Sequence, residues 1–243
     1  MDNPVAANVL GTMGAVLWSL QLLPQIWKNY RRHSTKSLST TFFLAWAIAG
    51  VPLGIYNIAE SFNVALQVQP NILIFLSLVT WSQCKYYGDK WTIKKVGFVA
   101  TIVAVVLGGI EVGLVYGIRS ANERGQEWAA ILMASLAAAL LAGGVLRHYL
   151  DMFRTQSDAG LSLRFAILDA SGDVVSLLSV GFQPTIDVLG VVVYATELGV
   201  WIGLMVIVLW FRVVKGRRDC DIEESEESDE TPTTNSDEEE IVG

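Results

Sequence analysis

Seven segments of the sequence are mostly apolar and about 20 residues long, which is the length of α-helix that crosses the hydrocarbon core of a bilayer. They cover roughly residues 5–27, 40–59, 67–87, 95–118, 128–150, 161–182 and 185–211. Because lipid offers no hydrogen-bond partners, such a segment must pair its backbone groups internally, as a helix does. We therefore predict an all-α integral membrane protein with seven transmembrane helices.

The basic residues predict how the chain is oriented. Of the 17 lysines and arginines, all except Arg119 and Arg124 fall in or beside the links after the first, third and fifth helices, or behind the seventh. Membrane proteins keep such positive charge on the cytosolic side. The bias predicts a lumenal or extracellular N-terminus and a cytosolic C-terminus, which agrees with an odd number of crossings.

The last part of the chain, residues 219–243, is acidic and rich in serine and threonine. Such a segment cannot bury enough apolar surface to fold, so we predict a disordered cytosolic tail. The tail accounts for the net charge of −7. No feature indicates nucleic-acid binding.

Motifs of enzymes are not evident. The two cysteines, Cys84 and Cys220, have no zinc-ligand spacing, and we find no nucleophile–base set or phosphate-binding loop. We expect no enzymatic activity, no cofactor and no metal site. The partners that we expect are a small-molecule solute, protons and the lipid bilayer, and the sequence does not indicate an oligomeric state.

An internal repeat relates two parts of the chain. Residues 31–43 (RRHSTKSLSTTFF) match residues 154–166 (RTQSDAGLSLRFA) at a constant offset of 123 positions. The identical pairs are Arg31 and Arg154, Ser34 and Ser157, Leu38 and Leu161, Ser39 and Ser162, and Phe42 and Phe165. We predict a three-helix repeat over residues 5–90, a linker helix over 95–118 and a second repeat over 128–212. One linker helix keeps the two repeats parallel, a transporter arrangement with its site between the halves.

The motifs around this repeat resemble those of the PQ-loop repeat family. Leu22-Leu23-Pro24-Gln25-Ile26, followed by Ser34 to Ser39, is similar to the first family signature, and Ser157 to Ser162 with Leu168 to Asp173 is similar to the second. The family includes cystinosin, lysosomal exporters of cationic amino acids and fungal vacuolar proteins, and SWEET sugar carriers share its architecture. The chain is most similar to fungal members. This resemblance implies a transporter of the vacuolar or lysosomal membrane.

Two acidic residues of the sixth helix are candidate proton sites. Asp169 and Asp173 are one helical turn apart and share a face, and an ionisable residue inside a membrane is a functional candidate. The resemblance implies that Asp169 carries the proton, because it matches the aspartate of the family motif Leu-Asp-x-x-Gly-Gly. Asp173 stands where the family has the second glycine. Glu197 in the seventh helix is the third candidate, and with Asp169 it could bind a proton and the amino group of a solute.

Other polar and proline residues are candidates for movement or for the transport path. Pro24 removes a backbone donor and bends its helix, and the resemblance implies a hinge there together with Gln25; a static kink is the alternative. The second repeat has Arg147-His148 where Pro-Gln would fall. Pro52 is a second hinge candidate. Tyr194, Asn57 and Gln83 are candidates for the solute path, and for Glu111 structural pairing and functional titration stay open.

These observations favour a proton-coupled secondary transporter that moves a small solute, with an amino acid as the favoured class, from lumen to cytosol by alternating access. Two alternatives stay open. A SWEET-like sugar facilitator would show flux that does not depend on pH, and a receptor or scaffold similar to the KDEL receptor would bind a ligand without transporting it.

Overall fold

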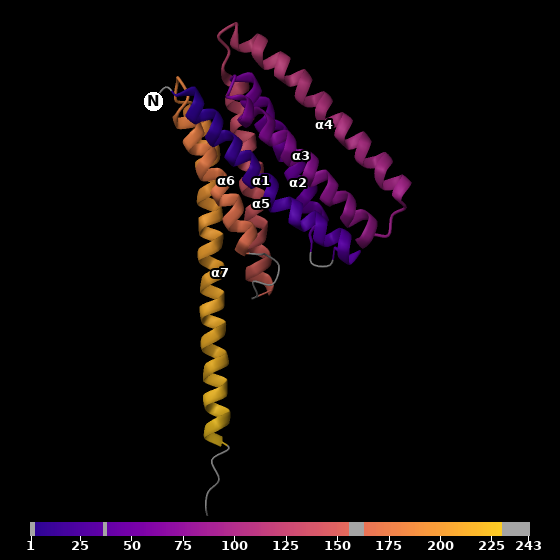
Figure 1. Cartoon of the computed structure of the whole chain (residues 1–243), viewed down its shortest axis with the longest axis vertical. Coiled ribbons are helices and arrows are strands. Elements are labelled where there is room, and N and C mark those ends of the chain that lie inside the picture. The colour runs from indigo at the N-terminus through magenta and orange to yellow at the C-terminus, as the bar shows by residue number, and fades with distance from the viewer. Residues whose placement is uncertain (1–2, 36–37, 156–162, 230–243) are drawn as a thin grey trace, which may run out of the picture.

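The computed structural model describes residues 3–35, 38–155 and 163–229, which form seven α-helices and no strand (Figure 1). The helices are α1 (Pro4–Arg32), α2 (Thr40–Ala59), α3 (Val64–Gln83), α4 (Ile93–Asn122), α5 (Trp128–Thr155), α6 (Leu163–Gly181) and α7 (Val188–Asp229), and a π-helical turn, η1 (Cys84–Gly88), continues α3. The predicted all-α fold is confirmed.

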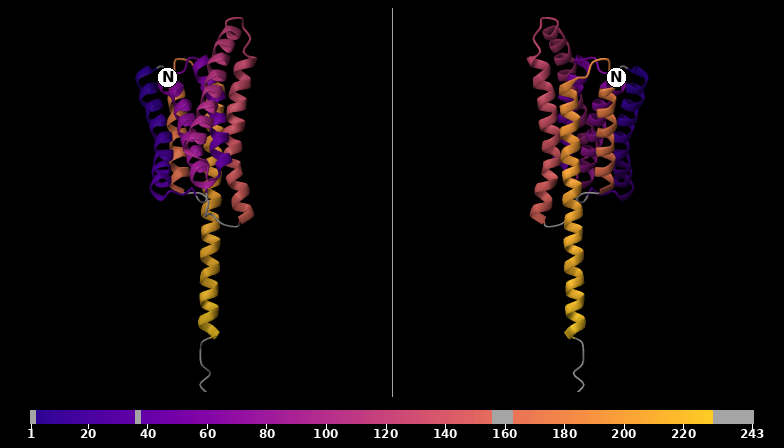
Figure 2. Two further views of the ribbon diagram at one scale, coloured as in Figure 1. Left: turned by 90° about the vertical axis from the view of Figure 1, so that its right-hand side faces the viewer. Right: turned by 90° about the vertical axis from the view of Figure 1, so that its left-hand side faces the viewer.

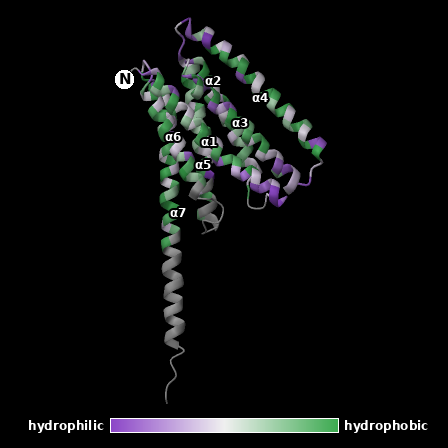
Figure 3. Ribbon diagram, in the orientation of Figure 1, coloured by the Kyte–Doolittle hydropathy of each residue, from purple (hydrophilic) through white to green (hydrophobic). Residues whose placement is uncertain are grey.

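In the described part of the chain, six helices are long and apolar enough to span a membrane. The exception is α6, whose 19 residues include Arg164, Asp169 and Asp173. This helix runs alongside α1 and α7 (Figure 2), and both aspartates are buried. Both aspartates therefore face other helices, whereas α4 exposes apolar side chains such as Val105 and Val112, as a lipid-facing helix does (Figure 3).

The packing order places α3 between α1 and α2, and α7 between α5 and α6. Two further helix pairs, α1 with α6 and α2 with α5, join these groups, and α4 packs mainly against α2. This is the order that two copies of one three-helix unit and a peripheral linker would give. The repeat itself stays a prediction, because residues 156–162, which hold Ser157, Leu161 and Ser162 of the second copy, lie outside the described residues, as do residues 36–37.

The structure differs from the sequence prediction at the end of the chain. The helix α7 continues to Asp229, into the segment 219–243 that we predicted to be disordered. Glutamate is a good helix former, so an acidic stretch that follows a stable helix can extend it. Residues 230–243 lie outside the described residues.

Each of the first three helices contains a proline: Pro24 in α1, Pro52 in α2 and Pro70 in α3. Pro70 has no N–H, so the carbonyl of Leu66, four residues earlier, loses its helical donor. Asn57 of α2 replaces this donor, because its Nδ2 lies 2.8 Å from the Leu66 oxygen. Both side chains are fully buried. The sequence analysis did not single out Pro70, and it considered Asn57 only for the solute path.

A double-mutant cycle tests this replacement. We expect Asn57→Leu to destabilise the protein by about 1–3 kcal/mol, because a buried carbonyl then has no donor. In a Pro70→Ala background, where the backbone donor is restored, the same substitution should be less costly by roughly 1 kcal/mol or more. Thermal unfolding in detergent measures both effects. Equal losses in the two backgrounds would show that Asn57 does not act through the Leu66 carbonyl.

Small residues let α1 and α6 approach each other closely. A Cβ atom at Gly14 would clash with the Ser176 hydroxyl, and one at Gly172 would clash with the indole of Trp18. Trp18 is 2% exposed, so its ring has little room to give way. The contact fixes the height of α6 relative to α1 and therefore the position of the two aspartates that flank Gly172.

We expect Gly172→Ala to destabilise the protein by about 1–3 kcal/mol through overpacking against Trp18. Gly113→Ala is the matched control on α4, where a Cβ would meet no atom within 4 Å. This control should be neutral or stabilising by roughly 0.5–1 kcal/mol, because alanine favours a helix over glycine. Melting temperatures in detergent provide the comparison, and equal melting temperatures for the two variants would contradict the proposed contact.

Candidate functional site

Three carboxylates meet in the interior of the helix bundle. Asp169 and Asp173 come from α6, and Glu197 comes from α7. Each residue has one carboxylate oxygen that lies within 4.8 Å of the corresponding oxygens of the other two. The three side chains are 1%, 0% and 2% exposed. This group of residues is called the carboxylate cluster below.

Among the side chains that the structure describes, the cluster has no buried positive partner. None of these buried side chains belongs to lysine, arginine or histidine. Isolated charges in a medium of low dielectric constant are very costly, and like charges this close raise that cost further. The cluster can therefore be stable only when protons or a bound cation neutralise most of its charge.

Side chains from α1 and α7 surround the cluster. Gln21 of α1 and Trp201 of α7 lie beside Asp169, Trp201 also lies beside Glu197, and Trp18 lies beside Asp173. Over the residues that the structure describes, the indole nitrogens of both tryptophans and the amide atoms of Gln21 approach the carboxylates without reaching the geometry of a full hydrogen bond. The cluster is thus lined by polar groups whose hydrogen-bonding capacity is only partly used.

A second polar group links the cluster to the α2–α3 pair. The Nδ2 atom of Asn57 donates to the Tyr194 hydroxyl at 3.1 Å, and the Tyr194 ring lies 6.3 Å from that of Trp18. Gln69 of α3 donates to Ser176 of α6 at 3.1 Å. The helices that carry the carboxylates are therefore tied to α2 and α3, the helices that contain Pro52 and Pro70.

Hydrogen bonds close the bundle at the end that holds the N-terminus. Asn63 donates to the Ser179 hydroxyl at 2.9 Å, and Ser179 donates to the Ala7 carbonyl at 2.6 Å. The hydroxyl of Tyr56 in α2 donates to Asp187, which directly precedes α7. These bonds join α1, α2 and the link between α2 and α3 to α6 and to the link before α7.

Aromatic rings close the opposite side of the cluster. Trp46 of α2 lies 5.8 Å from Phe165 of α6 and 6.3 Å from Trp201 of α7, measured between ring centroids. Phe42 lies 4.5 Å from Trp46. Because Trp201 also borders the carboxylates, this aromatic group lies next to them on the side away from the N-terminus. The hydrogen bonds on one side and the aromatic rings on the other therefore enclose the cluster.

The structure brings together some of the predicted site residues and separates others. Asp169, Asp173 and Glu197 meet in the cluster, and Tyr194 with Asn57 lies next to it. Gln25 and Gln83 belong to a different network, in which Gln25 donates to Asn29 at 2.7 Å and Asn29 donates to Gln83 at 3.0 Å. That network ties α1 to α3, so a role of Gln83 in the solute path has no support in this arrangement.

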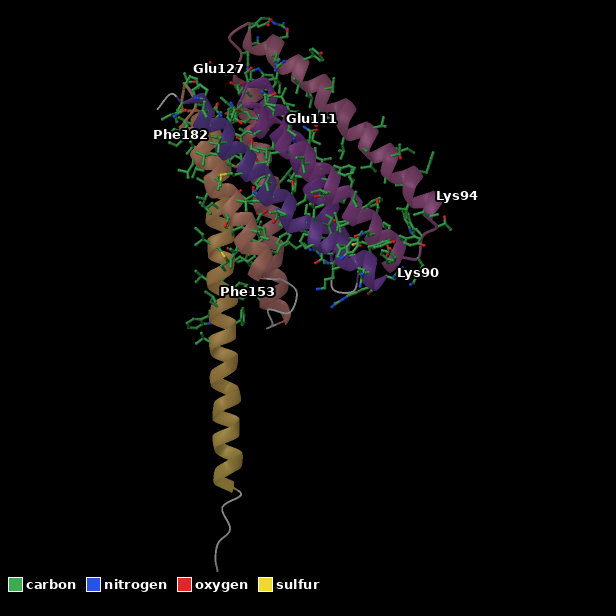
Figure 4. The ribbon with its side chains drawn as sticks, viewed as in Figure 1. Lys90, Lys94, Glu111, Glu127, Phe153 and Phe182 are labelled. Carbon is green, nitrogen blue, oxygen red and sulfur yellow. The ribbon has the colours of Figure 1, made fainter. Side chains whose placement is uncertain are left out.

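Glu111 has a structural partner. It is buried on α4 (labelled in Figure 4), accepts a hydrogen bond from Asn71 of α3 at 3.0 Å, and approaches Gly54 of α2 so closely that a Cβ there would clash. It therefore fastens the linker helix to α2 and α3.

A cavity of about 660 Å³ lies between α3 and α4 and is lined by residues such as His33, Phe75 and Tyr87, without any of the three carboxylates.

The sequence analysis missed Gln21, Trp18 and Trp201. Gln21 has a recognisable signal, because it is a polar residue one helical turn before Gln25 in an apolar segment. Trp18 also lies near the middle of α1 rather than at a membrane interface, where tryptophan usually lies. Neither signal alone indicates which helix the side chain faces.

Comparison with known proteins identifies the family. The model of the PQ loop repeat matches residues 6–66. An uncharacterised protein of Schizosaccharomyces pombe is 38% identical over 87% of this chain and 75% of its own length, and an uncharacterised membrane protein of Saccharomyces cerevisiae is 30% identical over 84% and 66%. Cystinosin of Drosophila melanogaster is 27% identical over 70% of this chain and 47% of its own length. The matched repeat and these relatives show that the chain belongs to the PQ-loop repeat family.

Proposed function

We propose that this protein is a proton-coupled secondary transporter that moves a small solute, with amino acids as the favoured class, by alternating access. The observation that carries the proposal is the carboxylate cluster, which is buried without a positive partner in the described structure. A carboxyl group in such a place is stable when protonated and becomes costly when it loses its proton. Proton binding and release therefore change the energy of the surrounding helices.

The position of the cluster supports transport rather than a purely structural role. It lies where α6 and α7 meet α1, between the two groups of helices that the predicted repeat defines. Transporters built from repeats hold their sites at such an interface. The similarity to cystinosin of Drosophila melanogaster supports a transporter of this kind, although the matched region covers 47% of that protein.

Alternating access requires that the two closures open in turn. In the proposed cycle, the hydrogen bonds of Tyr56 and Asn63 break to admit solute and protons from the side of the N-terminus. The aromatic contacts of Trp46 then separate to release them on the other side. Pro24, Pro52 and Pro70 mark the places where α1, α2 and α3 would change direction.

The proposed direction and location rest on charge and resemblance. The bias of lysine and arginine toward the end opposite the N-terminus favours a lumenal N-terminus and a cytosolic C-terminus. The resemblance to the family favours a vacuolar or lysosomal membrane, where an acidic lumen would supply the protons.

We expect Asp169→Asn to abolish solute-dependent proton uptake while the protein stays folded. Asparagine has the same shape but takes up and releases no proton. The measurement is pH-driven uptake by proteoliposomes, with cationic amino acids, cystine, neutral amino acids and hexoses offered in turn. Glu111→Gln is the matched control, because it neutralises a buried carboxylate that pairs with Asn71 outside the cluster.

The possible results separate the candidate functions. Proton-coupled flux that persists unchanged in Asp169→Asn would refute the role of this residue. Solute flux without proton movement in the unmodified protein would favour a sugar-facilitator type of carrier, and saturable ligand binding without flux would favour a receptor.

A further inference from the structure

The carboxylate cluster has the spacing of a metal site. Its three ligand oxygens lie within 4.8 Å of one another. Calcium binds oxygen atoms at 2.3–2.6 Å, so two ligands on opposite sides of the ion are about 4.6–5.2 Å apart. The three oxygens therefore lie within the span of the ligands of one such ion.

A fourth oxygen ligand is present beside the carboxylates. Gln21 is 3% exposed and lies against Asp169, and neither polar atom of its amide reaches the geometry of a full hydrogen bond among the residues that the structure describes. A buried amide that is not fully satisfied is costly. Since amide carbonyls are common ligands of calcium, a bound cation would satisfy Gln21 as well as the carboxylates.

The carboxylates also have oxygen atoms to spare. One oxygen of Asp169, both oxygens of Asp173 and one of Glu197 are buried without a hydrogen-bond partner in the described ranges. Either shared protons or a cation would satisfy these oxygens. A cation would satisfy oxygens of all three side chains at once.

The ligand set indicates which cation would fit. It contains oxygen atoms only, which favours a hard ion over zinc or copper. Three carboxylates favour a divalent over a monovalent ion on charge, and magnesium, which binds at 2.0–2.1 Å, demands a tighter octahedral shell. We propose that Asp169, Asp173, Glu197 and Gln21 form a binding site for a divalent cation of the size of calcium.

The cation and protons would compete for the same carboxylate oxygens. The proposal rests on the proposed function in this one respect, that the carboxyl groups of the cluster bind and release protons. The cluster is bordered by Trp18 and Gln21 from α1 and by Tyr194 and Trp201 from α7. Apart from the three carboxyl groups, Tyr194 is the one titratable side chain near the cluster among the described residues. Cation affinity should therefore fall as the pH is lowered and the carboxyl groups become protonated.

Terbium luminescence offers a direct test, because Tb³⁺ is a calcium substitute that tryptophan sensitises and both Trp18 and Trp201 border the cluster. We expect purified full-length protein in detergent to give a saturable signal that Ca²⁺ displaces and Mg²⁺ displaces poorly. Asp173→Asn should raise the half-saturating Tb³⁺ concentration at least about tenfold, because affinity follows ligand charge. Gln21→Leu should raise it by a smaller factor.

Glu111→Gln is the control, because it removes a buried carboxylate outside the cluster and leaves the acidic tail unchanged. Melting temperatures establish that each variant is folded, and Glu197→Gln takes the place of Asp173→Asn if the latter does not fold. An equal signal in the unmodified protein and in the folded cluster variant, or no saturable signal at all, would overturn the cation site. Because the assay requires no solute and no flux, this outcome leaves the proposed proton-coupled transport to be judged separately.

Discussion

The energetic cost of three carboxylates in a membrane interior governs the rest of this structure. Asp169, Asp173 and Glu197 are almost completely buried, and none of the basic side chains that the structure describes is buried. Hydrocarbon could not accommodate these groups, so α6 must be surrounded by other helices. This explains why α6, alone among the seven helices, falls short of the composition of a membrane span, and why tryptophans and Gln21 rather than leucines line its neighbours.

Backbone polarity sets a second constraint, and the same helices meet it. Pro70 leaves the Leu66 carbonyl without its helical donor, and Asn57 supplies one. The amide of Asn57 also reaches Tyr194, which lies one turn before Glu197 on α7. Pro70 of α3 and the carboxylate cluster are therefore connected through one buried side chain, so a shift of α7 would change the hydrogen bond that compensates for the proline.

The sequence was sufficient to predict the number and approximate bounds of the helices, because apolar length and breaks in it are local properties. The sequence also singled out the three carboxylates that meet in the structure, since an acidic residue within an apolar segment is conspicuous; their role in proton coupling stays a proposal. Gln21 and Trp201 were missed because their positions depend on which helices face each other. For Gln83, the polarity was evident in the sequence but the partner, Asn29, was not, and its place in the solute path stays a prediction.

The two closures of the cluster differ in what their opening would cost. At the end of the N-terminus, bonds such as those of Asn63 and Tyr56 can be exchanged for bonds to water, at a net cost of about 1 kcal/mol each. On the other side, Trp46, Phe165 and Trp201 must expose ring surface, at roughly 25 cal/mol for each Å². Opening the N-terminal end therefore exchanges hydrogen bonds, whereas opening the other side exposes apolar surface. Since Trp201 also borders Asp169 and Glu197, the charge state of the cluster acts directly on the aromatic closure.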